Sequence, residues 1–280
     1  ICGNFSSHTD FENQFSQFKS TPSSLIFPSG YQANIAAVTT FSDAETIVYS
    51  DANNHASLVD ACRLSRAKIR IYRHLDADHL YSLLLSDSAD IHFKSHKKIV
   101  LTDSVFSTDG ATAPLDTLSE ICNSYDALLF VDEAHATGVF GPDGAGLCSL
   151  HNISPDLQIS TLSKSFGLWG GVISTSEQFS DYLINKGRSF IFSTAPSPVL
   201  PVAAQRSLQI IVSKKGHTLR RRLHSNVSRL VRGLCSVGWP AKTDSHIVAV
   251  VLNDPKLSLA VSRWFFEKNI FLLPLRPPTV

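Results

Sequence analysis

The stretch ALLFVDEAH, residues 127–135, decides the fold class of this chain. Residues 127–131 are all apolar, which is typical of a strand that is buried on both faces of a parallel sheet. Asp132, Glu133 and His135 follow that strand directly. In open parallel sheets, ligands bind beyond the carboxyl ends of the strands. The stretch therefore predicts an α/β sheet and also the edge of that sheet at which chemistry should occur.

Short apolar runs and longer amphipathic stretches alternate on both sides of this strand. The other predicted strands are Thr46–Tyr49, Lys68–Tyr72, Ile99–Thr102, Leu157–Ser160, Gly171–Ser174 and Phe190–Phe192. The predicted helices are Tyr31–Phe41, Ala56–Ser65, Asp78–Leu85, Pro114–Ser124 and Glu177–Gly187. Such alternation favours a mainly parallel, seven-stranded sheet sandwiched between helices.

The pattern changes after Phe192, where Pro196, Pro198 and Pro201 interrupt it. Two long helical stretches are predicted in this part of the chain. The elements predicted there are helices at Val199–Val212, Thr218–Cys235 and Leu257–Lys268, and strands at His246–Leu252 and Ile270–Leu273. We therefore expect a large domain over residues 1–211 and a smaller, incomplete C-terminal αβ domain over residues 212–280.

Composition excludes several classes of protein. The 280 residues carry a formal net charge of +1, 43% are hydrophobic and 18% are charged, as expected for a globular chain. The near-neutral charge argues against a nucleic-acid partner. No apolar run reaches the roughly 18 residues that a membrane span needs.

Cysteine usage indicates a reducing compartment. None of the five cysteines has CxxC spacing, so the sequence predicts neither a metal site nor a disulfide framework. We expect a cytoplasmic location. The chain begins with Ile1, contains no methionine and ends in RPPTV, from which we expect a piece of a longer protein.

The DEAH motif at residues 132–135 also occurs in helicase ATPases, where it helps to hold magnesium. That interpretation requires an upstream phosphate loop ending in Gly-Lys, and the chain contains no Gly-Lys pair. A GxSxG nucleophile motif and a GxGxxG dinucleotide motif are also absent. The sequence therefore favours a different role for Asp132.

A second motif, STLSKSFG at residues 160–167, surrounds Lys164 with hydroxyl groups directly after a predicted strand. Alone, it could be an ordinary loop lysine beside capping residues. However, Lys164 lies 32 residues after Asp132, one strand–helix unit further on, so both side chains can face one cleft. A lysine that forms a Schiff base and a carboxylate that keeps a pyridine nitrogen protonated are the pair that pyridoxal phosphate requires.

Three further segments fit this scheme, although each also has a plainer interpretation. Gly30 opens a predicted helix whose amides could hold a phosphate. His55 begins another helix and could stack on a cofactor ring, or could simply be a capping residue. Ser107 offers a hydroxyl after a strand, or could belong to an ordinary turn.

Together these segments resemble the α-oxoamine synthases, pyridoxal-phosphate enzymes of the aspartate-aminotransferase (type I) fold. The matching stretches are SGYQANIA (29–36), NHASLVDACRLSRA (54–67), TDSVFSTDGATAPLDTL (102–118), VDEAHATGVFGPDGAG (131–146), STLSKSFGLWGG (160–171), FIFSTAPSP (190–198), HIVAVVLND (246–254) and LRPPTV (275–280). The resemblance covers almost the whole chain, in a fixed order.

The resemblance implies roles for individual residues. Lys164 would form the Schiff base with the cofactor, and Asp132 would pair with the ring nitrogen. His135 and Ser107 would approach the phenolic oxygen of the ring, and His55 would stack on the ring and touch substrate.

The resemblance also implies contacts on the phosphate side and with the substrate. Gly30, Tyr31 and Thr161 would serve the phosphate, and Thr279 would contact substrate. The chain departs from the family pattern at Ala61, Thr108 and Ala111. It also lacks the family's amino-terminal arm and the arginine segment that normally binds the substrate carboxylate.

Within the family, the RPPTV ending and the FIFSTAPSP segment most resemble those of one kind of enzyme. The resemblance implies a homodimer that condenses L-alanine with pimeloyl-CoA, or with pimeloyl-carrier protein, and releases carbon dioxide in biotin synthesis. Two alternatives stay open. The chain could resemble the sister enzymes 2-amino-3-ketobutyrate CoA ligase and 5-aminolevulinate synthase. It could also be a non-catalytic regulatory relative, although the presence of Lys164 speaks against that.

Overall fold

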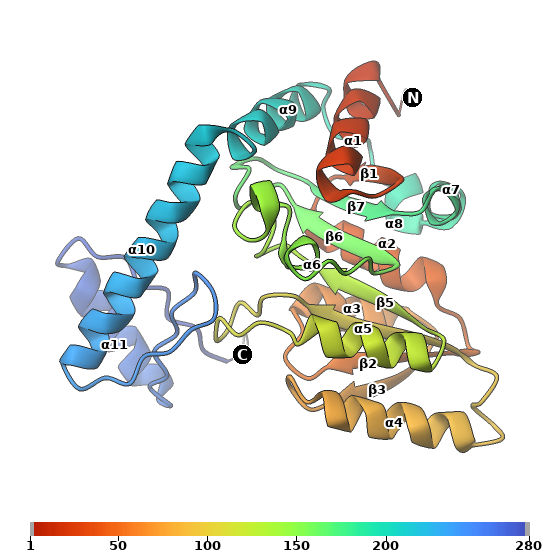
Figure 1. Ribbon diagram of the computed structural model, residues 1–280, viewed down its shortest axis with the longest axis horizontal. Helices are drawn as coiled ribbons and strands as arrows, with labels where there is room; N and C mark the ends of the chain where they lie inside the picture. The colour runs from red at the N-terminus through yellow and green to blue at the C-terminus, as the bar shows by residue number, and fades with distance from the viewer. Residues whose placement is uncertain (1–2, 278–280) are drawn as a thin grey trace. The chain divides into compact units, whose positions relative to one another are not determined.

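The computed structural model describes residues 3–277, and its central feature is one seven-stranded sheet (Figure 1). The strand order is β1-β7-β6-β5-β4-β2-β3. The strands are β1 (Ser23–Phe27), β2 (Thr46–Asp51), β3 (Lys68–Tyr72), β4 (Lys97–Asp103), β5 (Ala127–Asp132), β6 (Leu157–Thr161) and β7 (Gly171–Thr175). The expected mainly parallel sheet of seven strands is confirmed.

Strand direction changes at only one strand of this sheet. Strands β3, β2, β4, β5 and β6 run parallel to one another. Strand β7 is antiparallel to both of its neighbours, β6 and β1. The carboxyl ends of β4, β5 and β6 therefore meet at the same edge of the sheet, the edge that the sequence predicts to carry the site.

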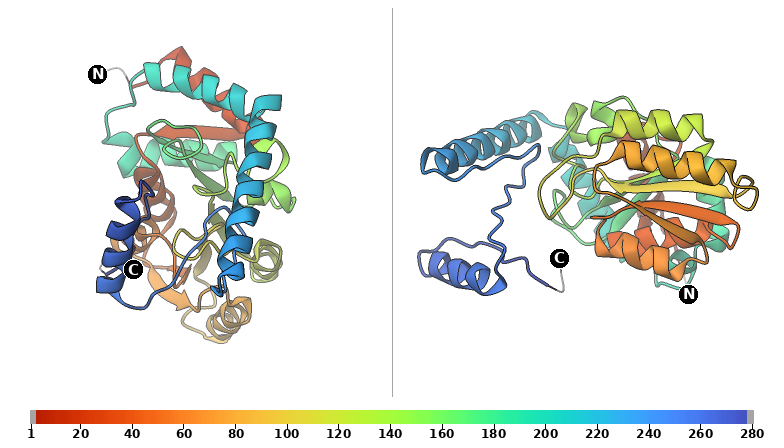
Figure 2. Two further views of the ribbon diagram at one scale, coloured as in Figure 1. Left: turned by 90° about the vertical axis from the view of Figure 1, so that its left-hand side faces the viewer. Right: turned by 90° about the horizontal axis from the view of Figure 1, so that it is seen from below.

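Helices cover both faces of the sheet (Figure 2). The helices of the first unit are α1 (Ser6–Lys19), α2 (Gly30–Phe41), α3 (Ala56–Leu64), α4 (Ala77–Ala89), α5 (Leu115–Ser124), α6 (Leu147–Leu150), α7 (Glu177–Lys186), α8 (Arg188–Ile191) and α9 (Val199–Ile211). Helices α10 (Lys214–Ser236) and α11 (Pro255–Phe266) follow in the chain. None of the helices in the described part of the chain combines the length and apolar character that crossing a membrane requires.

Each face of the sheet has its own hydrophobic core. Ala37 of α2 and Leu58 of α3 pack against strand residues such as Phe130 on one face. The second cluster joins α1 and α9, and it includes Phe15 and Phe166, whose ring centroids lie 5.9 Å apart. Alternate residues of a strand point to opposite faces, so a strand buried between two cores must be apolar throughout.

The chain divides into two compact units. The first comprises Ile1–Phe106 with Thr112–Arg222 and contains the whole sheet. The second comprises Ser107–Ala111 with Leu223–Val280 and contains α11. The domain division expected at residues 211–212 stays a prediction.

The first sheet edge differs from the sequence-based expectation. Phe190–Phe192 is not a strand, because residues 188–191 form the short helix α8, in which the Ile191 N–H donates to the Gly187 carbonyl at 2.9 Å. The seventh strand is instead β1, which pairs with β7 along its whole length. Helix α1 was not predicted either.

The second unit contains fewer strands than expected. His246–Leu252 and Ile270–Leu273 adopt no regular secondary structure in the described residues, so both strand predictions are wrong. A strand is stable only when a neighbour pairs with its backbone, and neither segment has such a partner in the described part of the chain. The helix predicted at Leu257–Lys268 is present as α11, displaced by two residues.

Candidate active site

A cavity of about 700 Å³ opens at the carboxyl ends of the parallel strands, between the beginnings of α2 and α3. Its lining combines carboxylates, imidazoles, hydroxyls and one primary amine. The lining residues are Pro28, Ser29, Gly30, Tyr31, Gln32, Asn34, His55, Ser57, Asp103, Asp132, Ala134, His135, Ile159, Ser160, Thr161, Ser163, Lys164, Trp169 and Gly170.

Asp132 is a buried acid that lines this cavity. It is the last residue of β5, so the strand holds its backbone rigidly. Its carboxylate accepts hydrogen bonds from the Asn34 amide at 2.7 Å and from the Ala134 N–H at 2.8 Å. Both donors are uncharged, so neither forms an ion pair with Asp132.

Lys164 reaches the same cavity from the loop that follows β6. That loop is held at its base by Thr161, whose hydroxyl is 2.8 Å from the Ser163 hydroxyl and donates to the Gly170 carbonyl at 3.1 Å. The loop therefore has a fixed shape although Lys164 itself is exposed. A primary amine held in this way can reach a carbonyl group in the cavity.

The amino terminus of α2 forms the wall opposite Lys164. The Ser29 hydroxyl caps the helix by accepting from the Gln32 N–H at 3.1 Å. A Cβ at Gly30 would lie 3.3 Å from Thr161, and one at Gly171 would lie 2.6 Å from the Ser29 carbonyl oxygen. The two glycines thus allow strand and helix to approach closely, and the free N–H groups of the helix terminus suit an anion.

His55 caps α3 at the rim of the cavity. Its Nδ1 accepts from the Ser57 N–H at 3.2 Å and lies 2.7 Å from the Ser57 hydroxyl. An Nδ1 that accepts a backbone N–H leaves the proton of a neutral imidazole on Nε2. The same Ser57 hydroxyl accepts from Asn34 at 2.8 Å, so Asn34 links Asp132 to the residue that holds His55.

A buried ion pair holds the residue that follows Asp132. Lys19, the last residue of α1, contacts Glu133, which directly follows Asp132, and both side chains are fully buried. Lys19 also donates to the Ala145 carbonyl at 2.6 Å, and Glu133 accepts from the Cys148 N–H at 2.9 Å. The position of Asp132 thus depends on contacts with α1 and with the loop before α6.

Most of the predicted site residues line this one cavity. They are Gly30, Tyr31, His55, Asp132, His135, Thr161 and Lys164. The Tyr31 hydroxyl donates to Asp60 at 2.8 Å, and this bond raises the pKa of the Tyr31 phenol. Ser107 belongs to the second compact unit, and Thr279 lies outside the described residues. The roles of both residues stay predictions.

The sequence-based reasoning did not identify Asn34, Asp103 and Trp169 as site residues. Asn34 lies one helical turn after Gly30, on the same face of α2, and this spacing was a usable signal. Asp103 directly follows a predicted strand, as Asp132 does, and the two are the last residues of β4 and β5. Nothing in its local sequence marks Trp169, which is exposed at the rim.

The aminotransferase class I and II family matches the chain over residues 1–280. The chain belongs to this family. Among curated relatives, 8-amino-7-oxononanoate synthase 2 of Bacillus subtilis (strain 168) is 37% identical over 279 residues, which cover 99% of this chain and 70% of the relative. The 8-amino-7-oxononanoate synthase of Lysinibacillus sphaericus is 36% identical over 281 residues, again covering 99% and 70%.

Solved structures of the same family have the same fold. A serine palmitoyltransferase from S. paucimobilis with a bound PLP–myriocin aldimine superposes with a TM-score of 0.92 and 28% identity, covering 99% of this chain and 69% of the other. The 8-amino-7-oxononanoate synthase from Francisella tularensis gives a TM-score of 0.84 and 28% identity, covering 100% and 80%. The type I fold is therefore confirmed for this member of the aminotransferase family.

Pyridoxal phosphate, the cofactor of this family, fits the residues that line the cavity. The buried Asp132 offers an anion for the ring nitrogen, and Lys164 offers an amine for the aldehyde. The amino terminus of α2 at Gly30 offers N–H groups for the phosphate. Each of the three functional groups of the cofactor thus has a chemical counterpart in one cavity.

Proposed function

We propose that this aminotransferase-family protein catalyses the decarboxylating condensation of L-alanine with a pimeloyl thioester, carried by CoA or by a carrier protein, to give 8-amino-7-oxononanoate for biotin synthesis. The names of relatives at 36–37% identity support this substrate pair. The observation that carries the proposal is that Lys164, Asp132 and His55 line one cavity although they come from three separate segments.

The cofactor, when bound, supplies an electron sink for the negative charge that develops at the α-carbon of the amino acid. Lys164 would bind the aldehyde of the cofactor and move the α-proton of the substrate, because it is the primary amine of the cavity. Asp132 would be the partner of the ring nitrogen. The Asn34 hydrogen bond fixes the direction in which the Asp132 carboxylate points.

His55 and the amino terminus of α2 orient the reactants. The Ser57 contacts engage Nδ1 of His55, which lines the cavity, and leave Nε2 available to a substrate. The α2 amides and the Thr161 hydroxyl would hold the phosphate of the cofactor, and Lys164 lines the same cavity. Such preorganisation is the main contribution of the protein to a reaction whose electronics belong to the cofactor.

Borohydride reduction tests the assignment of Lys164. The protein is incubated with pyridoxal phosphate, reduced and digested, and the modified peptide is identified by mass spectrometry. We expect the label on Lys164 and its loss in Lys164→Ala, with no change in Lys186→Ala, which alters an exposed lysine on α7. A reducible adduct that persists in Lys164→Ala contradicts the proposal.

Turnover assays test the substrates. Alanine, glycine and serine are each combined with pimeloyl-, acetyl-, succinyl- and palmitoyl-CoA and with pimeloyl-carrier protein, using the natural full-length protein. Carbon dioxide release with alanine and a pimeloyl thioester supports the proposal. Preference for glycine favours the sister synthases, and preference for serine with palmitoyl-CoA favours an activity like that of the structural relative. Adduct formation without any turnover favours a non-catalytic relative.

A homodimer and a cytoplasmic location belong to the same proposal. Light scattering at assay concentration should give the mass of two chains. A monomer that turns over substrate contradicts the dimer.

A further inference from the structure

Asp103 is a second buried acid in the cavity, and it has no part in the proposed reaction. It is the last residue of β4, as Asp132 is the last residue of β5. The two strands are parallel neighbours, and Asp103 and Asp132 are partners in the register. Side chains at partner positions of parallel strands point to the same face of the sheet, so two acids stand side by side under the cofactor site.

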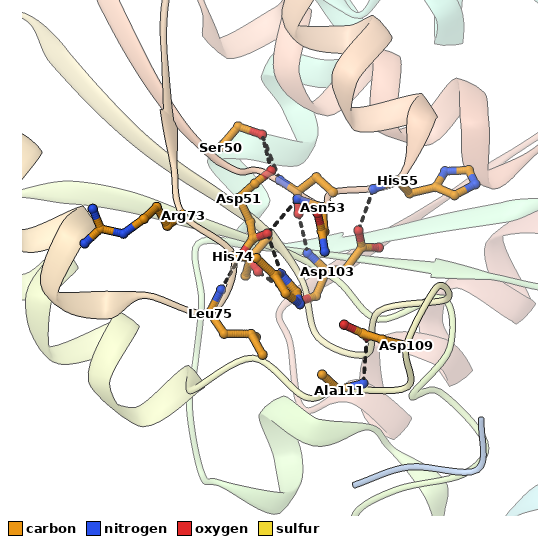
Figure 3. Close-up of polar contacts among 12 residues, drawn as sticks. Ser50, Asp51, Asn53, His55, Arg73, His74, Leu75, Asp103, Asp109 and Ala111 are labelled. Carbon is orange, nitrogen blue, oxygen red and sulfur yellow. Dashed lines mark hydrogen bonds and ion pairs between the residues drawn. The ribbon is translucent and has the colours of Figure 1, made fainter. Parts of the chain in front are cut away.

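The Asp103 carboxyl group holds the backbone of His55. Its Oδ2 accepts from the His55 N–H at 2.7 Å, and Figure 3 shows the imidazole pointing away from this contact. The Asp103 N–H donates to the Asn54 side-chain oxygen at 3.0 Å. The Asn54 side-chain nitrogen in turn donates to the Leu101 carbonyl at 2.8 Å. Backbone and side chain of Asp103 thus both anchor the two residues that lead into α3.

A second acid, Asp51, holds the beginning of the segment that leads to His55 and α3. Asp51, at the end of β2, accepts from the Asn53 N–H at 2.8 Å, from the Leu75 N–H at 2.9 Å and from His74 at 2.8 Å. Figure 3 shows the Asp51 and Asp103 carboxyl groups on either side of the segment that ends at His55. Asp51 does not line the cavity, whereas Asp103 does. The contact that joins this segment to the cavity is therefore the one between Asp103 and His55.

Burial and the neighbouring Asp132 raise the pKa of the Asp103 carboxyl group well above its usual range. Asp51 acts in the same direction, while Lys164 and the His55 N–H favour the charged form. Asp132 has two N–H donors, which suit a carboxylate, and Asp103 has the single bond from His55. Repulsion between neighbouring carboxylates in a buried site disfavours the charged form of Asp103, in the same direction as its burial.

We propose that Asp103 is a positioning residue for the reaction, acting through the hydrogen bond that its carboxyl group accepts from the His55 backbone. In this role it sets the height of the His55 ring over the cavity. The inference rests on the proposed function, because the ring that His55 would stack on is that of pyridoxal phosphate.

A double-mutant cycle on cofactor affinity tests the proposal. The dissociation constant of pyridoxal phosphate is measured by fluorescence quenching in the wild type, Asp103→Ala, His55→Ala and the double variant. We expect Asp103→Ala to weaken binding about tenfold, and to weaken it less than about twofold when His55 is already alanine. An equal loss in both backgrounds, or no loss in the single variant, overturns the proposal.

Asp103→Asn separates the hydrogen bond from the charge. Its side-chain oxygen can still accept from His55, so affinity should stay within about threefold of the wild type. A tenfold loss in this variant would show that the ionised carboxylate is what binding needs, and would contradict the positioning role of Asp103.

Asp87→Asn is the matched control, because Asp87 is a buried acid that pairs with Arg70 and does not line the cavity. It should lower the melting temperature without changing cofactor affinity.

Carbon-13 NMR of the apo-protein gives a readout that does not involve the cofactor. The carboxyl signal that disappears in Asp103→Asn should titrate at a higher pH than the ordinary carboxyl range. A signal that titrates within that range contradicts the raised pKa of Asp103. Since borohydride labelling of Lys164 is independent of both measurements, a labelled protein whose cofactor affinity ignores Asp103 would contradict this inference and leave the proposed function standing.

Discussion

The Asn34 side-chain nitrogen donates to the Asp132 carboxylate at 2.7 Å and to the Ser57 hydroxyl at 2.8 Å. One amide on α2 therefore connects the end of β5 with the first turn of α3 beneath the cavity. A change in the orientation of the Asp132 carboxylate therefore also affects the hydrogen bond between Asn34 and Ser57, the residue that contacts the His55 ring. The ring-nitrogen side and the stacking side of the site are thus coupled through Asn34.

Asn34→Ala should weaken cofactor binding about tenfold, since the buried Asp132 carboxylate loses one of its donors. The dissociation constant of pyridoxal phosphate measures the effect. Asn185→Ala is the control, because Asn185 is an exposed residue on α7 whose amide donates to the Asp181 carbonyl of its own helix. Equal affinities for the wild type and Asn34→Ala would contradict the coupling.

Asp132→Asn should lower kcat at least about 100-fold, which corresponds to ~2.7 kcal/mol of transition-state stabilisation. The carboxamide fills the same space but no longer favours a proton on the ring nitrogen. Steady-state carbon dioxide release with saturating substrates measures the loss. An Asp132→Asn enzyme with nearly wild-type kcat would show that the ring-nitrogen partner is another residue.

Lys19→Met should destabilise the fold by roughly 3–5 kcal/mol, because it leaves Glu133 charged and unpaired in a fully buried position. Urea unfolding of the apo-protein measures the free energy of unfolding. Arg63→Met breaks an ion pair with Asp60 that is largely exposed, so it should change that free energy by less than about 0.5 kcal/mol. Similar losses in the two variants would rule out the special role of burial.

Glu12 should make stability depend on pH. Burial raises the pKa of Glu12 from 4.5 to about 7, so the folded state binds this proton more tightly than the unfolded state does. The contribution of Glu12 to the free energy of unfolding is fully present below pH 4.5. It is lost as the pH rises toward 7, by about 3 kcal/mol in total.

Glu12→Gln should remove this slope, because the carboxamide can still accept the Ile26 N–H bond but does not ionise. Urea unfolding from the ordinary carboxyl range to neutral pH compares the two proteins. A wild-type protein whose stability rises across this range, or a variant that keeps the wild-type slope, would be inconsistent with a buried, protonated Glu12.

The sequence predicted the parts of the fold that depend on local pattern. Residues 127–131 are apolar at every position because β5 is buried on both faces: Phe130 belongs to the core with α2 and α3, and Leu129 and Val131 are buried as well. The strand and the site were predicted from that run. Asp132 and Lys164 were predictable as a pair because their chemistry is specific and each follows a strand. The cavity that contains both confirms that the two strand ends face the same space.

Elements that depend on distant partners were not predictable in the same way. Three apolar residues at 190–192 suit a strand or a helical turn equally, and the contact with the Gly187 carbonyl decides for the helix. Strand β1 exists because β7 pairs with it. Its spacing from Gly30 places Asn34 on the cavity side of α2, but its partner Asp132 lies 98 positions away and no local pattern predicts that hydrogen bond.

The contact between Lys19 and Glu133 has a consequence for the order of folding. The two residues lie 114 positions apart, so a growing chain exposes α1 long before its partner has been synthesised. Until then Lys19 must stay hydrated, because an unpaired ammonium group cannot enter a dry interior. Burial of Lys19 therefore needs Glu133 in place, and closing so long a loop is slow compared with forming local contacts.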